Sequence, residues 1–520
     1  MKNKFYYIMA LSLIVALTSC DYLDVPFDNR TDIHTEEQIN KLLVAAYTTS
    51  SEWVMAEFSS DNVDHMIGPG FNIDSSLDEE AFNWAQITGI NQDTPHAFWG
   101  AAYGAIANAN LALISIERLE RENGGLTHTL RALRAEALMT RAYNHFLLAS
   151  IFCMPYGSNA VNELGVYYMT HIESTVAPQY SRGNLADLFY NINRDIVVAL
   201  PHIVDGHLAV PQYRFNRRAA HAFAARFNLH YRRFEEVVRY ANVVLGSNPA
   251  AVLRDWQHGG SLQLQGDFRP NWFVMNNHAN LLNTVASSRH FRILGPTGLA
   301  TRFAHNQLIA STESSRSSTP WPGGHRFPSV GFAGGNPKII SFKFTEYFRI
   351  TDPIAGIGFP HIIQVHFTTD ETLLMRAEAL VMLGRYQEAV NDMNTFMVNF
   401  ANTTPRTLEQ IVNFYNNMPY HTPLVPTPKK RLMNPDSGIV EGSVQENLLH
   451  AVLHLRRILT MHEGLRWQDI RRHGIEIVRR DVQDLTVIRT GDILTYDDPR
   501  RAIQIPETVA AAGVEQNPRR

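Results

Sequence analysis

The chain has 520 residues, of which 45% are hydrophobic, 18% charged and 10% aromatic, a globular composition that excludes a wholly disordered or fibrous protein. Its formal charge of −4 at pH 7 provides no strong cationic field, which argues against a nucleic-acid partner. Its only two cysteines, Cys20 and Cys153, exclude a disulfide framework and a cysteine cage for zinc.

The N-terminus has the layout of a secretory signal peptide. Lys2 and Lys4 give a positive start, and residues 8–17 (IMALSLIVAL) form an apolar run in which only Ser12 is polar. As a helix this run would span roughly 15 Å, about half of the ~30 Å hydrocarbon thickness of a bilayer. It therefore fits a signal peptide over residues 1–19 better than a membrane anchor. No later apolar run reaches the roughly 18 residues that a spanning helix needs.

Residues 17–20 (LTSC) resemble the bacterial lipobox, in which small residues precede a cysteine that is diacylated and becomes the first residue of the mature protein. Several acyl chains on Cys20 would anchor the protein firmly in a membrane. Asp21 and Asp24 follow closely and resemble an acidic surface-export signal. An ordinary secretory signal followed by a chance cysteine is the alternative.

Apolar residues spaced by three and four predict helices through much of the remaining chain. The first runs over 98–119 and ends at Gly124-Gly125, and the second, over 130–152, is closed by Pro155 and Gly157. Gly384 stands where a left-handed helix cap is expected. Further helices are predicted over 185–200, 217–231, 234–245, 371–383, 386–400, 445–460 and 467–480.

Two of these helix pairs resemble tetratricopeptide units, which are helix–turn–helix repeats of about 34 residues. Ala377, Gly384, Tyr386 and Ala389 follow the repeat's pattern of small, glycine, aromatic and alanine positions. The pair over 217–245 follows it less closely. The sequence therefore predicts a mostly α protein with tetratricopeptide-like helix pairs and a loop-rich, irregular part that binds the ligand.

Segments 54–97, 250–360 and 403–440 are rich in Gly, Pro, Ser and Asn and are longer than ordinary connections, which indicates functional loops. A short strand is expected over 339–344. After the signal peptide we expect an N-terminal region over 20–230 and a C-terminal region over 231–520, with a loop-rich insert at about 250–360, together forming one compact body.

No catalytic arrangement is apparent. The sequence lacks G-x-S-x-G, a glycine-rich phosphate loop and H-E-x-x-H, so neither an enzyme nor a metal or cofactor site is predicted. Cys153, at the end of an apolar helix, is expected to be a small core residue. The arginine-rich segment 463–472 is expected to be structural, with arginines that bridge carboxylates and stack on Trp467.

Candidate ligand contacts come from tryptophans in polar sequence, because a sugar ring offers apolar faces to an aromatic platform and hydroxyl edges to amides, carboxylates and arginine. Three sets are predicted: Asp61 and Asn62 with Trp84; Asn271 and Trp272 with Asn276, Asn277 and Arg292; and Trp321 with Arg316 and His325. For any single tryptophan, anchoring of its loop on the body is the alternative.

Six segments, in order along the chain, resemble the SusD/RagB family of lipidated nutrient-binding proteins. They are residues 20–26 (CDYLDVP), 99–110 (WGAAYGAIANAN), 135–146, the helix pairs over 219–245 and 373–393, 463–472 (EGLRWQDI and Arg472), and 503–518 with IQIPE and QNP. The family's ligand contacts lie in variable loops, so the resemblance assigns none of them here.

The resemblance implies a helical body with four tetratricopeptide-like units and attachment to the outer membrane, facing the cell surface. It also implies a SusC-type TonB-dependent transporter as partner, and an oligosaccharide or a peptide as ligand. A secreted glycan-degrading enzyme and a protein-binding repeat scaffold are the alternative functions.

Overall fold

A computed structural model describes residues 33–71, 75–173, 180–262, 265–274, 277–295, 301–323, 329–331, 338–401 and 403–519. The expected signal peptide and Cys20 therefore lie outside the described residues, as do Asn276 and His325.

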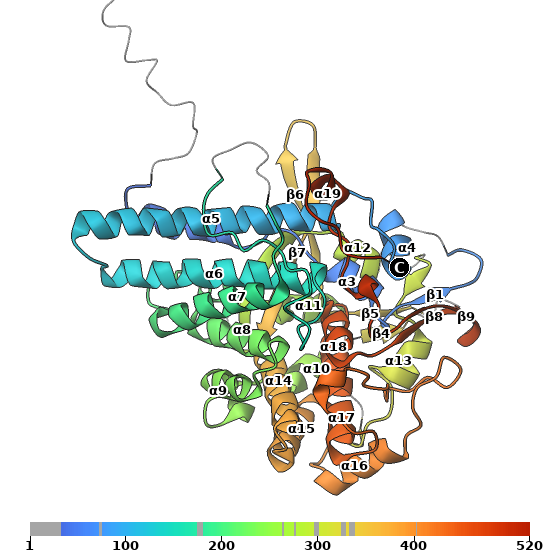
Figure 1. Cartoon of the computed structure of the whole chain (residues 1–520). Coiled ribbons are helices and arrows are strands. Elements are labelled where there is room, and N and C mark those ends of the chain that lie inside the picture. Colours follow the sequence, from blue (N-terminus) through green and yellow to red (C-terminus); the bar gives the residue numbers. More distant parts are fainter. Residues whose placement is uncertain are drawn as a thin grey trace, which may run out of the picture.

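Helices make up most of the body (Figure 1). The long or paired helices are α5 (Pro95–Asn123), α6 (His128–Phe152), α7 (Leu185–Ala199), α8 (Arg217–His230), α9 (Phe234–Leu245), α14 (Thr369–Met382), α15 (Tyr386–Phe400), α16 (Leu408–Asn417), α17 (Val444–Leu459) and α18 (Leu465–His473). The shorter ones are α2 (Glu36–Leu43), α3 (Trp53–Ser59), α4 (Ser76–Phe82), α10 (Trp256–Ser261), α11 (Gln265–Trp272), α12 (His290–Leu294), α13 (Gln307–Glu313) and α19 (Glu507–Ala511).

Local sequence sets the ends of these helices. The Thr94 hydroxyl accepts a hydrogen bond from the backbone N–H of Ala97, and Pro95 occupies the first turn of α5. The first backbone N–H groups of a helix have no acceptor within it. The Thr94 hydroxyl provides an acceptor for one of them, and Pro95 has no N–H that needs one. Gly124 ends α5 in the left-handed conformation, with φ 70°, where a side chain would be strained.

Helices that are adjacent in the chain pack as antiparallel pairs: α5 with α6, α8 with α9, and α14 with α15. α14 also packs on α9 and on α17, so the pairs share one apolar core. Small residues such as Ala225 and Ala377 are fully buried in it, which lets neighbouring helix backbones approach closely. The predicted helical class and its tetratricopeptide-like pairs are confirmed.

One predicted helix is wrong over its second half. Residues 467–480 were expected to form a single helix, but α18 ends at His473 and Gly474 adopts the left-handed conformation, with φ 65°. The chain then enters a strand, β8 (Ile477–Gln483). A glycine at a helix C-terminus followed by alternating Ile475, Ile477 and Arg479 is a strand signal that a helical period obscures.

Within the described residues, three small sheets accompany the helices. One has the order β3 (Phe303–Ala304), β1 (Asp64–Met66), β8 and β9 (Thr486–Leu494), with β1 parallel to β8. A second, antiparallel sheet has the order β2 (Asn280–Ser287), β7 (Ile357–Thr368) and β6 (Glu346–Asp352). The third pairs β4 (Ser329–Gly331) with β5 (Ile339–Ser341), which confirms the strand expected near 339–344.

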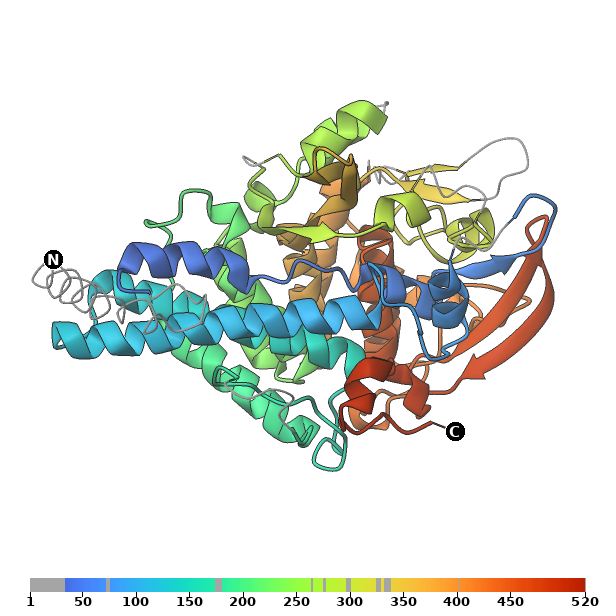
Figure 2. The same ribbon diagram turned by 90° about the horizontal axis from the view of Figure 1, so that it is seen from above.

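The outer ends of the two longest helices and the four-stranded sheet lie at opposite ends of the molecule. Figure 1 and Figure 2 both show the outer ends of α5 and α6 at one end, and β8 with β9 at the other. In the part of the chain that the structure describes, α5 alone is long and apolar enough to cross a membrane. It packs against α2 and α6, and core helices of soluble proteins pass the same test, so this is weak evidence of a span.

Candidate functional site

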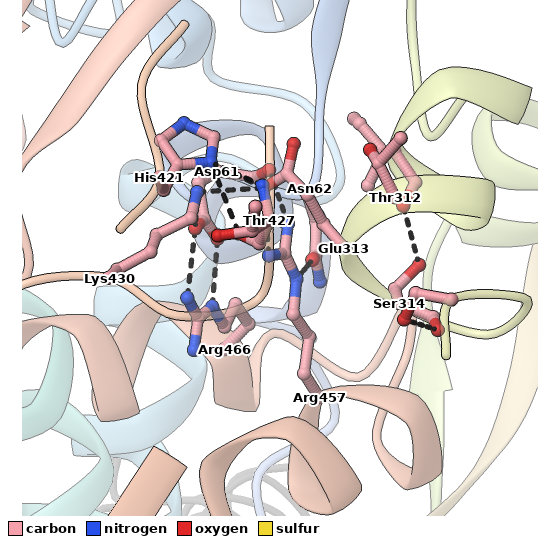
Figure 3. A network of polar contacts seen from close by, with 12 residues as sticks. Asp61, Asn62, Thr312, Glu313, Ser314, His421, Thr427, Lys430, Arg457 and Arg466 are labelled. Atoms are coloured by element: carbon pink, nitrogen blue, oxygen red, sulfur yellow. Dashed lines mark hydrogen bonds and ion pairs between the residues drawn. The ribbon is translucent and has the colours of Figure 1, made fainter. Parts of the chain in front are cut away.

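Asp61 and Asn62, two predicted ligand contacts, lie inside a buried polar network (Figure 3). Asp61 accepts hydrogen bonds from Arg466 Nε and Nη2 at 2.8 and 2.9 Å and lies 2.6 Å from Lys430 Nζ. Asn62 Oδ1 accepts from Arg457 Nε at 2.8 Å. We call this network the buried ion cluster. Its residues are Asp61, Asn62, Glu313, Lys430, Arg457, Arg466 and Arg480.

Glu313, at the C-terminal end of α13, is the second acidic centre of the buried ion cluster. Its carboxylate is 2.8 Å from Lys430 Nζ, 3.1 Å from Arg457 Nη1 and 2.8 Å from Arg480 Nη1. Burial alone would raise the pKa of Glu313, but Arg480, Lys430 and the other nearby cations outweigh burial and hold that pKa well below its ordinary value.

This cluster joins segments that are far apart in the chain. Arg480 on β8 donates to Asp64 on β1 at 2.8 Å, and the cations of α17 and α18 reach acids near α3 and α13. Its side chains are buried and already paired, so the cluster holds the molecule together rather than offering an open ligand site. No group of three or more His, Cys, Asp or Glu among the described residues is placed to hold a metal ion.

All three predicted tryptophan platforms are covered. Trp84 donates to the Ser59 carbonyl at 2.9 Å, with the Arg479 guanidinium 4.1 Å from its ring centre. The Arg254 guanidinium lies 3.7 Å from the centre of the Trp272 ring. Trp321, 1% exposed, donates to Asn394 at 2.8 Å. These rings anchor their segments, and a ligand contact by any of them stays a prediction that requires the cover to move.

The predicted sets are brought together only in part. Trp84 and the Asp61–Asn62 pair share a neighbour, because Arg479 over Trp84 also donates to the Ser60 carbonyl at 2.7 Å. Arg292 instead pairs with Glu346 at 2.7 Å. Arg316 is exposed, but the third member of its set, His325, lies outside the described residues.

An open, aromatic-lined groove with a volume of about 540 Å³ lies along the outer side of α5. We call it the aromatic groove. Trp99, Tyr103 and Leu111 of α5 form one wall. Tyr167, Met169 and Tyr180 from the segment after α6 form the second, and Val509 and Val514 from the C-terminal segment close one end. Figure 1 and Figure 2 show α19 beside the N-terminal end of α5, where His96 and Thr508 are 3.0 Å apart.

Ring stacking shapes the aromatic groove. Tyr167 and Tyr180 stack with their ring centres 4.3 Å apart and their planes 22° apart. The ring centres of Trp99 and Tyr103 are 5.1 Å apart. The Tyr103 hydroxyl donates to the Tyr167 carbonyl at 3.0 Å. These four rings are only partly buried, so a ligand can reach flat aromatic faces here, unlike those of the covered tryptophans.

A buried arginine fixes the floor of the aromatic groove. Arg182 donates to the carbonyls of Gly165 and Phe152 at 2.7 and 3.1 Å, and to Asn517 Oδ1 at 2.8 Å. It thereby ties the Tyr167 segment to α6 and to the C-terminal tail. Polar groups at the rim come from Asn108 and Glu173. The groove is therefore preformed, mostly apolar, and edged by an amide and a carboxylate.

Sequence reasoning missed this site for an identifiable reason. Trp99 and Tyr103 belong to the helical apolar pattern over 98–119, which favours core packing, while Tyr167 and Tyr180 lie in a segment for which the sequence predicts no element. The available signal was the i, i+4 spacing of Trp99 and Tyr103 on a helix whose Gly100 and Gly104 are exposed. Exposed glycines beside such rings leave the ring faces open.

A second hollow, of about 710 Å³, lies between α7, α8 and α9. Its charged lining includes Arg217, Arg233, Arg239 and Glu236. Arg239 pairs with Glu236 in the same helix turn, and the lining contains one tyrosine, Tyr240, and no stacked ring pair. It therefore lacks the flat apolar surface of the aromatic groove.

Comparisons with known proteins agree with this architecture. Residues 21–229 match the sequence model of the SusD-like family, described as "Starch-binding associating with outer membrane". No curated protein matches the chain. Solved structures are also similar over nearly the whole chain, and three of them illustrate the likeness.

The first of these structures is a SusD superfamily protein from Bacteroides thetaiotaomicron VPI-5482, with TM-score 0.61, 16% identity, and coverage of 93% of this chain and 100% of that one. The second is a SusD superfamily protein from Bacteroides vulgatus ATCC 8482, with TM-score 0.61, 18% identity, and coverage of 94% and 99%. The third is a SusD-like carbohydrate binding protein from the same organism, with TM-score 0.58, 14% identity, and coverage of 92% and 97%. At these identities the likeness establishes the fold.

Proposed function

We propose that this chain is a member of the SusD-like family and an outer-membrane surface lipoprotein that captures oligosaccharides or peptides without cleaving them. In the same proposal it delivers them to a SusC-type TonB-dependent transporter. The family is described as starch-binding and associated with the outer membrane. Cys20, in its lipobox-like context, would provide the membrane attachment.

The aromatic groove carries the proposal for the capture step. Its partly exposed rings offer apolar faces of the size of a sugar ring, and the stacked Tyr167–Tyr180 pair holds one such face in place before a ligand arrives. Preorganised aromatic contacts lower the ordering cost of binding. The apolar lining also suits side chains of a peptide, so peptides remain a ligand class to be tested against glycans.

Calorimetric titration of the chain with a panel of oligosaccharides and peptides tests this function. Tyr180→Ala should weaken binding of the ligand at least about tenfold, or roughly 1.4 kcal/mol, because it removes one member of the stacked pair. Tyr190→Ala is the matched control, since Tyr190 is a 60% exposed tyrosine on α7, away from the groove. The Tyr190→Ala variant should bind the ligand with unchanged affinity.

Chromatography of the same mixtures distinguishes capture from catalysis. We expect bound ligand to be recovered intact, with no shortened products. Products formed with turnover would favour a glycan-degrading enzyme. Equal affinity of Tyr180→Ala and Tyr190→Ala would remove the aromatic groove from the proposal. No binding of any oligosaccharide or peptide would favour a protein-binding scaffold.

A further inference from the structure

The β6–β7 hairpin carries an apolar surface that the proposed function does not use. Figure 1 shows it standing clear of the helical body, beside α19. Its large apolar side chains are exposed, and the exposure is greatest at the apex, where Ile354 is 99% exposed. We call residues 348–359 the hairpin tip, and its exposed apolar side chains are Phe348, Ile350, Ile354, Ile357 and Phe359.

Both faces of the hairpin tip carry exposed apolar side chains. In the antiparallel register Ile350 lies opposite Gly358, and Arg349 lies opposite Phe359. Because opposed residues share a face and side chains alternate along a strand, Phe348 and Ile350 occupy one face. Ile357 and Phe359 occupy the other, which they share with the exposed Arg349. Exposed hairpins are ordinarily protected by charged residues. The hairpin tip has two, Arg349 and Asp352, and residues 353–360 (PIAGIGFP) contain none.

The turn of the hairpin is built to hold Ile354 outward. Asp352 Oδ1 accepts hydrogen bonds from the backbone N–H groups of Ile354 and Ala355 at 2.9 and 3.0 Å. Gly356 adopts a φ of 65°, which favours glycine. The apex is therefore an ordered turn whose polar groups are satisfied locally, while its apolar side chains face away from the body.

We propose that the hairpin tip inserts into the lipid surface to which the chain is tethered, as a second membrane contact beside the acylated Cys20. A protein partner docking on a ribbon covers one face, whereas a tip with exposed apolar side chains on two faces and at its apex suits a medium that surrounds it. Unpaired backbone groups at strand edges are costly in hydrocarbon, so insertion stops at the interface.

Reach and depth agree with this placement. Residues 21–32 separate Cys20 from Ile33, and this tether extends at most about 40 Å. α2 packs on α5, and Figure 1 shows the hairpin projecting on the α5 side of the body. From Ile350 to the apex the strand rises about 10 Å, similar to the roughly 5–10 Å by which interfacial apolar faces enter a membrane. The inference rests on the proposed anchoring at Cys20 and is independent of the aromatic groove.

Depth-dependent fluorescence quenching tests the inference on the full lipidated chain. Ile354→Cys carries an environment-sensitive dye, and the chain is reconstituted in phosphatidylethanolamine–phosphatidylglycerol vesicles with brominated acyl chains. Leu424→Cys is the matched control, because Leu424 is a 76% exposed aliphatic residue in the segment after α16. We expect at least about twofold quenching at position 354 and none at position 424.

Three results would overturn the inference. The first is a chain that sediments with the vesicles while the label at 354 stays unquenched. The second is equal quenching at 354 and 424, which would indicate non-specific adsorption of the whole body. The third is quenching at 354 that persists when Ile357→Asp and Phe359→Asp are added. A chain that does not sediment refutes the anchoring at Cys20 and the inference with it.

Discussion

Buried charges determine how several single residues behave in this protein. Asp61 is surrounded by Arg457, Arg466 and Lys430. Burial alone would raise its pKa, but those three cations outweigh burial and hold the pKa of Asp61 well below its ordinary value. The charge of Asp61 is thus already matched inside the protein, and a ligand contact by this residue stays a prediction.

Glu313→Gln should destabilise the fold strongly. Removing this carboxylate leaves Arg457, Arg480 and Lys430 buried with less compensation, and breaking such a buried pair costs about 3–5 kcal/mol. Glu388→Gln is the control, since Glu388 makes an exposed pair with Arg385 at 2.7 Å, worth roughly 0.2–1 kcal/mol. Equal midpoints of urea unfolding for the two variants would contradict this account of the buried ion cluster.

At the scale of elements, helical periodicity predicted most of the scaffold. Helices α9 and α15 begin and end where the apolar pattern predicted, and Cys153 is a buried core residue as expected. Segment 463–472 is structural as predicted: Arg472 donates to Glu378 at 2.6 Å and the Arg471 guanidinium lies 5.9 Å from the Trp467 ring centre. Local spacing encodes such elements because each helix has one face to bury.

The missed elements depend on contacts that the local sequence does not contain. β8 pairs with β1, which lies more than 400 residues earlier in the chain, so no local pattern near Arg480 could reveal this pairing. The tryptophans Trp272 and Trp321 stand in polar sequence, yet Arg254 and Asn394 from other segments cover them or accept their hydrogen bonds. The polar neighbours of these two tryptophans in the sequence therefore indicated that their rings are exposed, whereas the fold buries them.

Gly474→Ala should destabilise the fold at the turn between α18 and β8. Gly474 has φ 65°, and an added Cβ would lie 2.6 Å from the backbone nitrogen of Asn434, so strain and a clash act together. Gly384→Ala is the control: its φ is 74° and nothing lies within 4 Å of an added Cβ, which leaves conformational strain of about 1 kcal/mol. Thermal unfolding should show a clearly larger loss for Gly474→Ala, and equal losses would contradict the close packing.

At the scale of the whole molecule, the candidate site is formed by long-range assembly. The aromatic groove combines α5, the segment around Tyr167 and the C-terminal segment. Tyr103 and Val509, which both line it, are some 400 residues apart in the chain. Arg182 secures this assembly through Asn517. Sequence predicted the body that presents the groove, but the groove itself exists only after these segments meet.

Stability should fall on acidification below neutral pH. Burial lowers the pKa of His145, His305, His366 and His421 to about 3, and that of His290 to about 4. Below about pH 6.5 the unfolded chain therefore binds more protons at these residues than the folded chain does. Each such histidine contributes roughly 1.4 kcal/mol of lost stability per pH unit in that window.

Three buried carboxyls act in the opposite direction. Burial raises the pKa of Glu52 and Glu57 to about 7 and that of Asp93 to about 6, so their ionisation destabilises the fold as pH rises above about 4.5. The histidines outnumber them, and we expect the free energy of unfolding to be at least about 1 kcal/mol lower at pH 5 than at pH 7. Urea titrations that give an equal or higher value at pH 5 would contradict this balance.

The most direct test of the capture mechanism is a crystal structure of the chain with an oligosaccharide or peptide that binds it in calorimetry. We predict intact ligand packed against Trp99, Tyr167 and Tyr180, beside the tail that contains Val509. Ligand found only elsewhere, such as over Trp84, Trp272 or Trp321, or ligand found cleaved, would contradict the account.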